Sequence, residues 1–79
     1  MEKLVKLMAG LLRIPEKEVT DELSIINTDT WDSLKHMELV VTIEETFGIK
    51  LTANEIVSMV NVNKIKRILK DKGVNINGD

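Results

Sequence analysis

The chain has 79 residues, of which 43% are apolar and only 3% aromatic, it carries a net charge of −2, and it contains no cysteine. This length makes one small domain, residues 1–79, and the composition favours helices over a sheet. Without cysteine there is no disulfide, thiolate metal ligand or catalytic thiol, so the fold depends on helix packing and any thiol must come from a prosthetic group. No apolar stretch approaches the roughly 20 residues that cross a bilayer, and the chain starts without a secretory signal pattern. We therefore expect a cytoplasmic protein that does not enter a membrane.

The first predicted helix has apolar residues at i, i+3, i+4 and i+7 spacing and ends at Pro15. These residues are Leu4, Val5, Leu7, Met8, Leu11 and Leu12. A long polar stretch then runs to Asp32, and loops of this length are usually functional or held by apolar contacts. Leu23, Ile25 and Ile26 are expected to hold it against the bundle.

The second predicted helix begins after Asp32, a favoured N-cap residue, which leaves Ser33 exposed at the first helical position. Its apolar residues form a broad stripe that should face the core, with the polar residues on the opposite arc. The stripe consists of Met37, Leu39, Val40, Val41, Ile43 and Phe47.

Thr52 and Glu55 have the spacing of a capping box, so a short third helix should run to about Met59 or Val60. Asn61 is expected to cap a fourth helix that ends at Gly73. Its apolar face comprises Val62, Ile65, Ile68 and Leu69. The predicted fold is all-α, a four-helix bundle with a long first loop and a short third helix.

The acidic residues are concentrated in one part of the chain. Residues 16–45 hold nine acidic and two basic residues, a net charge of −7, whereas the rest of the chain carries +5. A partner of the acidic part should present lysines and arginines and should bind more weakly as salt increases. The alternative is an ordinary solvated surface.

Three other kinds of site have little support. Ser33 and His36 lie one turn apart and could act as nucleophile and base, with Asp32 or Asp29 orienting the imidazole, but a short bundle supplies neither oxyanion donors nor a cleft. A lone histidine and scattered carboxylates lack metal-ligand spacing, and the basic residues near the C-terminus come without stacking aromatics. Those basic residues are Lys64, Lys66, Arg67, Lys70 and Lys72. We therefore expect no hydrolase, no metal site and no nucleic-acid partner.

The run Trp31-Asp32-Ser33-Leu34, with the helical pattern after it, resembles the acyl carrier protein family, whose signature is an Asp-Ser-Leu at the start of the second helix. The similarity continues through residues 37–49 and 61–65, so it covers about Leu4 to Leu69. It implies a non-catalytic carrier in which a phosphopantetheinyl transferase moves 4'-phosphopantetheine from coenzyme A to Ser33, and acyl groups then travel as thioesters. It also implies that Asp32 helps to present the serine and that Leu34 contacts the transferase or begins the core.

The same resemblance assigns residues to partners and cargo. Contacts with acyl-loading and acyl-transferring enzymes that carry basic docking patches are expected from Trp31, Lys35, His36, Glu38, Glu44, Glu45 and Glu55. The acyl-sheltering positions are Ile25, Leu39, Val40, Ile43, Leu51, Ile56, Met59 and Ile65, although any bundle core would need the same residues. His36 is expected at the rim of the acyl entrance. Trp31 is expected to be exposed or half-buried beside the arm, or alternatively to cap the apolar end of the bundle.

Housekeeping fatty-acid carriers read Leu-Gly-x-Asp-Ser-Leu, whereas here Thr30-Trp31 precedes Asp32 and Lys35-His36 follows Leu34. These departures resemble discrete carriers of a specialised fatty-acid, lipid or polyketide-type pathway. Two alternatives stay open, an aminoacyl or peptidyl carrier of a peptide synthetase or D-alanylation system and a bundle that only binds partners. A monomer is the expected state of a protein that is handed between enzymes.

Overall fold

The computed structural model describes residues 2–75 and contains, within them, four α-helices and one 3-10 turn. In chain order they are α1 (Glu2–Leu12), η1 (Glu16–Glu18), α2 (Ser33–Phe47), α3 (Ala53–Ser58) and α4 (Val62–Asp71). These residues form no strand, and an isolated bridge joins Ser24 to Asn61. The prediction of an all-α fold with a long first loop and a short third helix is confirmed.

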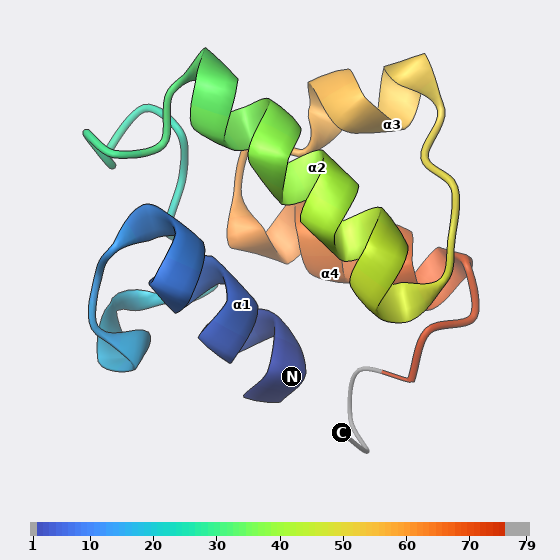
Figure 1. Ribbon diagram of the computed structural model, residues 1–79, viewed down its shortest axis with the longest axis horizontal. Helices are drawn as coiled ribbons and strands as arrows, with labels where there is room; N and C mark the ends of the chain where they lie inside the picture. Colours follow the sequence, from blue (N-terminus) through green and yellow to red (C-terminus); the bar gives the residue numbers. More distant parts are fainter. Residues whose placement is uncertain (1, 76–79) are drawn as a thin grey trace.

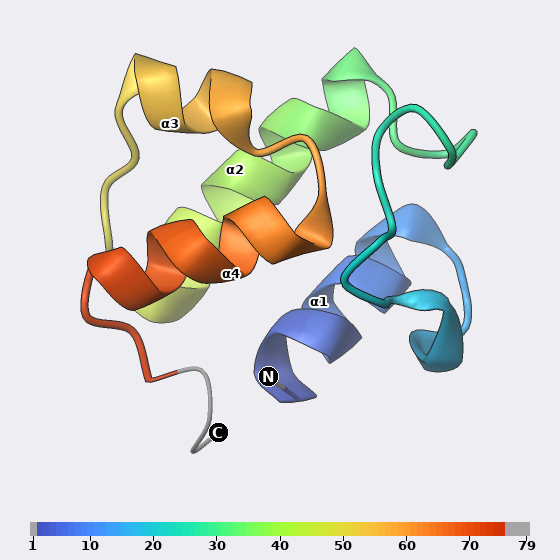
Figure 2. The same ribbon diagram turned by 180° about the vertical axis from the view of Figure 1, so that it is seen from behind.

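The helices pack around one core rather than along one common axis. α2 crosses in front of α4 in Figure 1, and α4 lies in front of α2 in the reverse view of Figure 2. α1 packs beside α2, the long loop runs past the end of α1, and α3 lies at the other side of α2. The loop therefore delivers the chain to the first turn of α2 at one corner of the molecule.

The predicted caps form where the sequence places them. Asp32, Thr52 and Asn61 each accept a hydrogen bond from the backbone N–H three residues later, and Thr52 and Glu55 complete a capping box. α2 ends at Gly48, whose φ of 66° is the left-handed conformation that glycine adopts without strain. α3 ends at Ser58, just before the expected end, and α4 ends at Asp71 rather than at Gly73.

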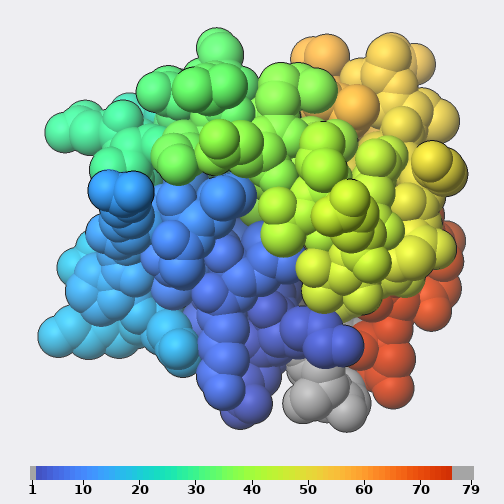
Figure 3. Space-filling model, viewed as in Figure 1, coloured from blue at the N-terminus to red at the C-terminus, as the bar shows by residue number. Residues whose placement is uncertain are grey.

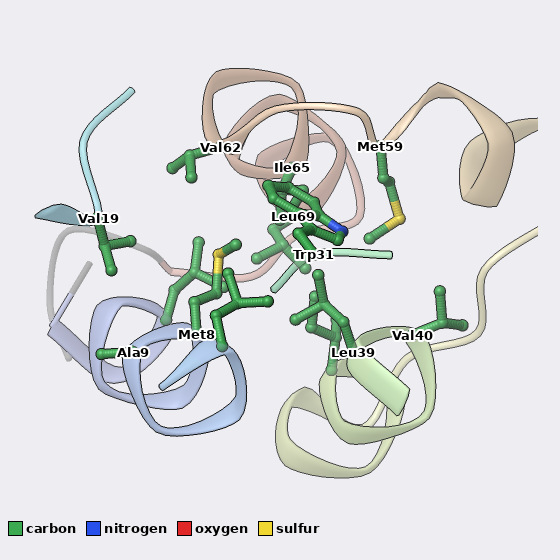
Figure 4. Packing of buried hydrophobic residues seen from close by; sticks show 13 residues of the cluster. Met8, Ala9, Val19, Trp31, Leu39, Val40, Met59, Val62, Ile65 and Leu69 are labelled. Carbon is green, nitrogen blue, oxygen red and sulfur yellow. The ribbon is translucent and has the colours of Figure 1, made fainter. Parts of the chain in front are cut away.

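The core takes one apolar face from each long helix. Leu4, Met8 and Leu12 repeat every four residues on α1, so they share one side of that helix. They pack in one cluster with Leu39, Val40 and Ile43 of α2 and with Val62, Ile65 and Leu69 of α4. Trp31 lies in the middle of this cluster in Figure 4, and Val19 and Met59 complete it from the connecting segments.

α2 has two apolar faces, and the prediction that its apolar residues form a single core-facing stripe is wrong. Leu39, Val40 and Ile43 are buried, but Leu34, Met37 and Val41 are 69%, 50% and 50% exposed. The second group has i, i+3, i+7 spacing, which places it on the arc opposite the first. Figure 3 shows α2 running across one face of the molecule, and α2 is open to solvent along much of that length.

The long loop is held by backbone hydrogen bonds as well as by apolar contacts. The Ile25 N–H donates to the Val60 carbonyl over 2.9 Å, and the Val62 N–H donates to the Leu23 carbonyl over 3.0 Å. Leu23 and Ile25 are half-buried against the core, as predicted. Ile26 is 93% exposed, so its predicted role in holding the loop is wrong. Ile25 and Ile26 lie in a turn that the Asn27 N–H closes on the Ser24 carbonyl, and the turn directs Ile26 to solvent while Ile25 packs against the core.

None of the helices in residues 2–75 has the length and apolar character needed to cross a membrane.

Candidate functional site

Ser33 is the first residue of α2, and its side chain is exposed. Asp32 precedes it in extended conformation, and its Oδ1 accepts a hydrogen bond from the Lys35 N–H over 2.9 Å. The Asp32 carbonyl accepts the first helical bond, from the His36 N–H, over 2.8 Å. A hydroxyl held in this way projects from the positive end of a helix of 15 residues, where a phosphate group is favoured.

Replacing Asp32 by alanine should lower the free energy of unfolding by about 0.5–2 kcal/mol, because the Lys35 N–H loses its cap. Asp32→Asn should keep most of that stability, since an asparagine oxygen accepts the same bond. Urea denaturation of both variants measures the contribution of the cap. Equal stability of the alanine variant and the unaltered protein would contradict the capping role.

A network within the loop fixes the approach to Ser33. The Asn27 Oδ1 accepts hydrogen bonds from the Ser24 N–H and the Thr28 hydroxyl, both over 2.9 Å. The backbone N–H of Trp31 donates to the Thr28 carbonyl over 3.0 Å. The residues before the cap are therefore ordered by their own hydrogen bonds.

Trp31 is 1% exposed, so the expectation that it lies exposed or half-buried beside the arm is wrong. Its indole ring stacks on His36 with 6.1 Å between ring centroids and 22° between ring planes. The alternative interpretation, in which it caps the apolar end of the bundle, agrees with this position. A contact between its side chain and a partner enzyme would require the core to open.

His36 is half-buried, and both of its ring nitrogens have intramolecular partners. Nδ1 lies 3.0 Å from the Trp31 Nε1, and Nε2 lies 2.8 Å from the Ile56 carbonyl oxygen. Neither nitrogen is free to take a proton from Ser33. The geometry therefore opposes a Ser33–His36 nucleophile and base.

The acidic residues predicted to contact partners divide into two groups. Glu38 and Glu45 are exposed on α2, and Glu38 pairs with Lys35 over 3.1 Å. The Glu44 Oε2 instead accepts the Leu51 N–H over 2.8 Å. The Glu55 carboxylate has two partners within the fold. Its Oε1 accepts a hydrogen bond from the Thr52 backbone N–H over 2.8 Å and forms an ion pair with Lys72 over 2.9 Å. Glu44 and Glu55 are therefore half-buried, and their carboxylates stabilise the fold through these intramolecular bonds.

The pKa of Glu55 is lowered from its ordinary value of 4.5, first by the hydrogen bond from the Thr52 backbone and then by the one from Lys72. A lowered pKa in the folded state means that the ionised carboxylate adds stability above its unfolded-state pKa, and that this part is lost as pH falls through the folded-state value. Glu55→Gln should therefore lose less thermal stability between neutral and acid pH than the unaltered chain. Melting curves across that pH range check this, and identical acid sensitivity of the two proteins would contradict it.

The eight predicted acyl-sheltering residues all lie in or against the core. Leu39, Val40, Ile43, Met59 and Ile65 are buried, and Ile25, Leu51 and Ile56 are half-buried. One surface hollow is lined by a member of this set, Ile25, together with Ile26, Val60 and Asn61. The acyl-sheltering role stays a prediction.

The exposed apolar face of α2 is the feature that sequence reasoning missed. Leu34, Met37 and Val41 line a shallow hollow with Leu11, Glu38 and Thr42, directly beside Ser33 in the sequence. The i, i+3, i+7 spacing was present in the sequence, and it could have identified a second stripe opposite the first.

Within residues 2–75, no group of three or more histidine or acidic side chains is arranged to hold a metal ion.

Comparison with known proteins agrees with this geometry. Residues 2–69 match the family described as the phosphopantetheine attachment site. The chain is 32% identical over 69 residues to the acyl carrier protein of Buchnera aphidicola subsp. Baizongia pistaciae, which covers 87% of this chain and 88% of that protein. It is 30% identical over 71 residues to the polyketide-8 synthase acyl carrier protein 2 of Streptomyces avermitilis, which covers 90% of this chain and 82% of that protein.

Proposed function

The chain belongs to the phosphopantetheine attachment-site family, and we propose that it carries acyl groups as thioesters on a 4'-phosphopantetheine arm attached to Ser33. As a carrier it is not itself an enzyme. The observation that carries the assignment of the residue is the exposed Ser33 hydroxyl at the first position of α2, immediately after the Asp32 cap. The two relatives named above are both acyl carrier proteins, which supports acyl groups over aminoacyl groups as cargo.

Each residue around the hydroxyl has a defined part in this function. Ser33 supplies the oxygen of the phosphodiester, and the N-terminal end of α2 stabilises the negative charge that the phosphodiester adds. Asp32 holds the first turn of the helix in place, and its carboxylate is exposed, which suits its proposed part in presenting the serine to a transferase. The arm, when attached, supplies the thiol that this cysteine-free chain lacks.

The exposed face of α2 is the proposed docking surface for the transferase and for acyl-loading and acyl-transferring enzymes. Its apolar part is Leu34, Met37 and Val41, and Glu38 and Glu45 add negative charge on the same helix. Because residues 16–45 carry a net charge of −7, partners with basic patches are attracted and the attraction weakens with salt. The proposed pathway class is fatty-acid, lipid or polyketide-type synthesis, and the name of the Streptomyces avermitilis relative, a polyketide-8 synthase acyl carrier protein, supports the polyketide type.

Val41→Asp should reduce the kcat/KM of phosphopantetheine transfer about tenfold, which corresponds to about 1.4 kcal/mol of lost binding. The side chain is half exposed, so the change removes apolar contact area from the docking face at little cost to the core. Val57→Asp is the matched control, because Val57 is 76% exposed on α3. Equal losses in the two variants would show that the α2 face has no special part in docking.

The attachment itself is tested by incubating the protein with coenzyme A, magnesium and a broad-specificity phosphopantetheinyl transferase. Intact mass should rise by one phosphopantetheine, and peptide fragmentation should locate it on Ser33. A mass that stays unchanged with several transferases, or an arm on another residue, would overturn the proposal.

A further inference from the structure

A chain of hydrogen bonds joins three elements next to Ser33. The Trp31 Nε1 lies 3.0 Å from the His36 Nδ1, and the His36 Nε2 lies 2.8 Å from the Ile56 carbonyl oxygen. An indole N–H can only donate, so Nδ1 is the acceptor and the neutral imidazole carries its proton on Nε2. Nε2 then donates to Ile56, and the loop, α2 and α3 are connected through one side chain.

The far end of this chain of bonds is the last turn of α3. That helix has only six residues, and its final carbonyls lie beyond the reach of intrahelical donors. The Met59 N–H donates to the Ile56 carbonyl over a long 3.4 Å, and the Val60 N–H donates to the Ser58 carbonyl over 2.9 Å. His36 therefore provides the short hydrogen bond that fixes the end of α3 against α2.

At the other end of this chain of hydrogen bonds, Trp31 is held by packing. Trp31 is 1% exposed, its ring stacks on His36, and it lies in the middle of the buried cluster in Figure 4. Breaking the bonds would leave the Trp31 indole N–H without its acceptor in a largely apolar place, which is costly, and would leave the Ile56 carbonyl with only the longer bond from the Met59 N–H. Hydrogen bonds and the packing of Trp31 against His36 therefore both hold this contact closed.

His36 also lies between Ser33 and the interior. Along the inner side of α2, His36 follows Ser33 by three residues, and Val40 and Ile43 follow His36 by four and seven, so they share one face of the helix. An acyl chain that started at Ser33 and entered between α2 and α3 would meet the His36–Ile56 contact before it met Val40. Entry would require that contact to open.

We propose that Trp31, His36 and the Ile56 carbonyl form a latch that keeps a Ser33-linked acyl chain outside the bundle, so that this carrier suits short or polar acyl groups. The inference rests on the proposed attachment at Ser33. A short or hydroxylated chain gains too little by burial to break these contacts, and a medium-length chain such as octanoyl stays outside while they hold. The latch therefore sets the class of cargo that the protein carries without rearrangement.

The test attaches a chain without any transferase. Because the sequence has no cysteine, Ser33→Cys provides a single thiol for a reagent with a polar linker of pantetheine length that ends in an octanoyl or an acetyl group. The measured quantity is the difference in thermal midpoint between the octanoyl and acetyl forms. With the latch intact we expect no difference, and no change in the NMR signals of the Val40 and Ile43 methyl groups.

Two variants open the latch in the Ser33→Cys background. Trp31→Phe keeps an aromatic ring but removes the N–H donor, and His36→Ala removes both hydrogen bonds, so one remains informative if the other folds poorly. In either variant the octanoyl form should melt several degrees above the acetyl form. An equal rise in the latched protein, or no rise in any variant, overturns the latch. Failure of the proposed function would appear separately, as no mass gain from coenzyme A and a transferase.

Discussion

Ser33→Ala should abolish the addition of phosphopantetheine while leaving the fold intact. The hydroxyl oxygen is the atom that forms the phosphodiester, so no residual modification is expected at this position. The side chain is exposed and alanine is the best helix former, so the midpoint of thermal unfolding should change little. Intact mass after incubation with coenzyme A, magnesium and a transferase measures the first effect, and circular dichroism measures the second.

Ser58→Ala is the matched control for this experiment. Ser58 is also an exposed helical serine, but it is the last residue of α3, and its hydroxyl donates to the Glu55 carbonyl over 3.0 Å. The control should accept one phosphopantetheine as the unaltered protein does. Full modification of Ser33→Ala, or loss of modification in Ser58→Ala, would move the attachment away from the start of α2.

Trp31→Ala should lower the free energy of unfolding by about 3–5 kcal/mol, the usual range for truncating a buried aromatic residue. Trp31 is 1% exposed and is the largest of the fully buried side chains of residues 2–75, so its removal leaves a large cavity and deprives His36 of its hydrogen-bond donor. A small domain has only about 5–15 kcal/mol in total, so the variant should be partly unfolded at moderate urea concentrations. Urea denaturation followed by circular dichroism gives the difference directly.

Ile26→Ala is the control for an apolar residue on the same loop. Ile26 is 93% exposed, so its truncation should change the free energy of unfolding by less than about 0.5 kcal/mol. If Trp31→Ala cost no more than Ile26→Ala, the indole would be exposed in solution. The latch inferred from its contact with His36 would then have no buried anchor.

The sequence by itself determined the features that depend on neighbouring residues. Asp32, Thr52 and Asn61 each bond a backbone N–H three residues away, so the positions where α2, α3 and α4 begin follow from local chemistry. The exposure of Ser33 follows from the first of these caps. The local pattern of α1 likewise predicted its apolar face, of which Leu4, Met8 and Leu12 are buried and Val5, Leu7 and Leu11 are half-buried.

The tertiary structure alone decided which side of each segment faces the core. Trp31 is buried and Ile26 is exposed, although both are large apolar residues of one loop, because burial depends on where α4 and the end of α3 pack against that loop. Two apolar stripes on α2 are equally visible in the sequence, and only the neighbouring helices determine which one is covered. The His36–Ile56 bond joins residues 20 apart along the chain, and no local pattern specifies a contact over that separation.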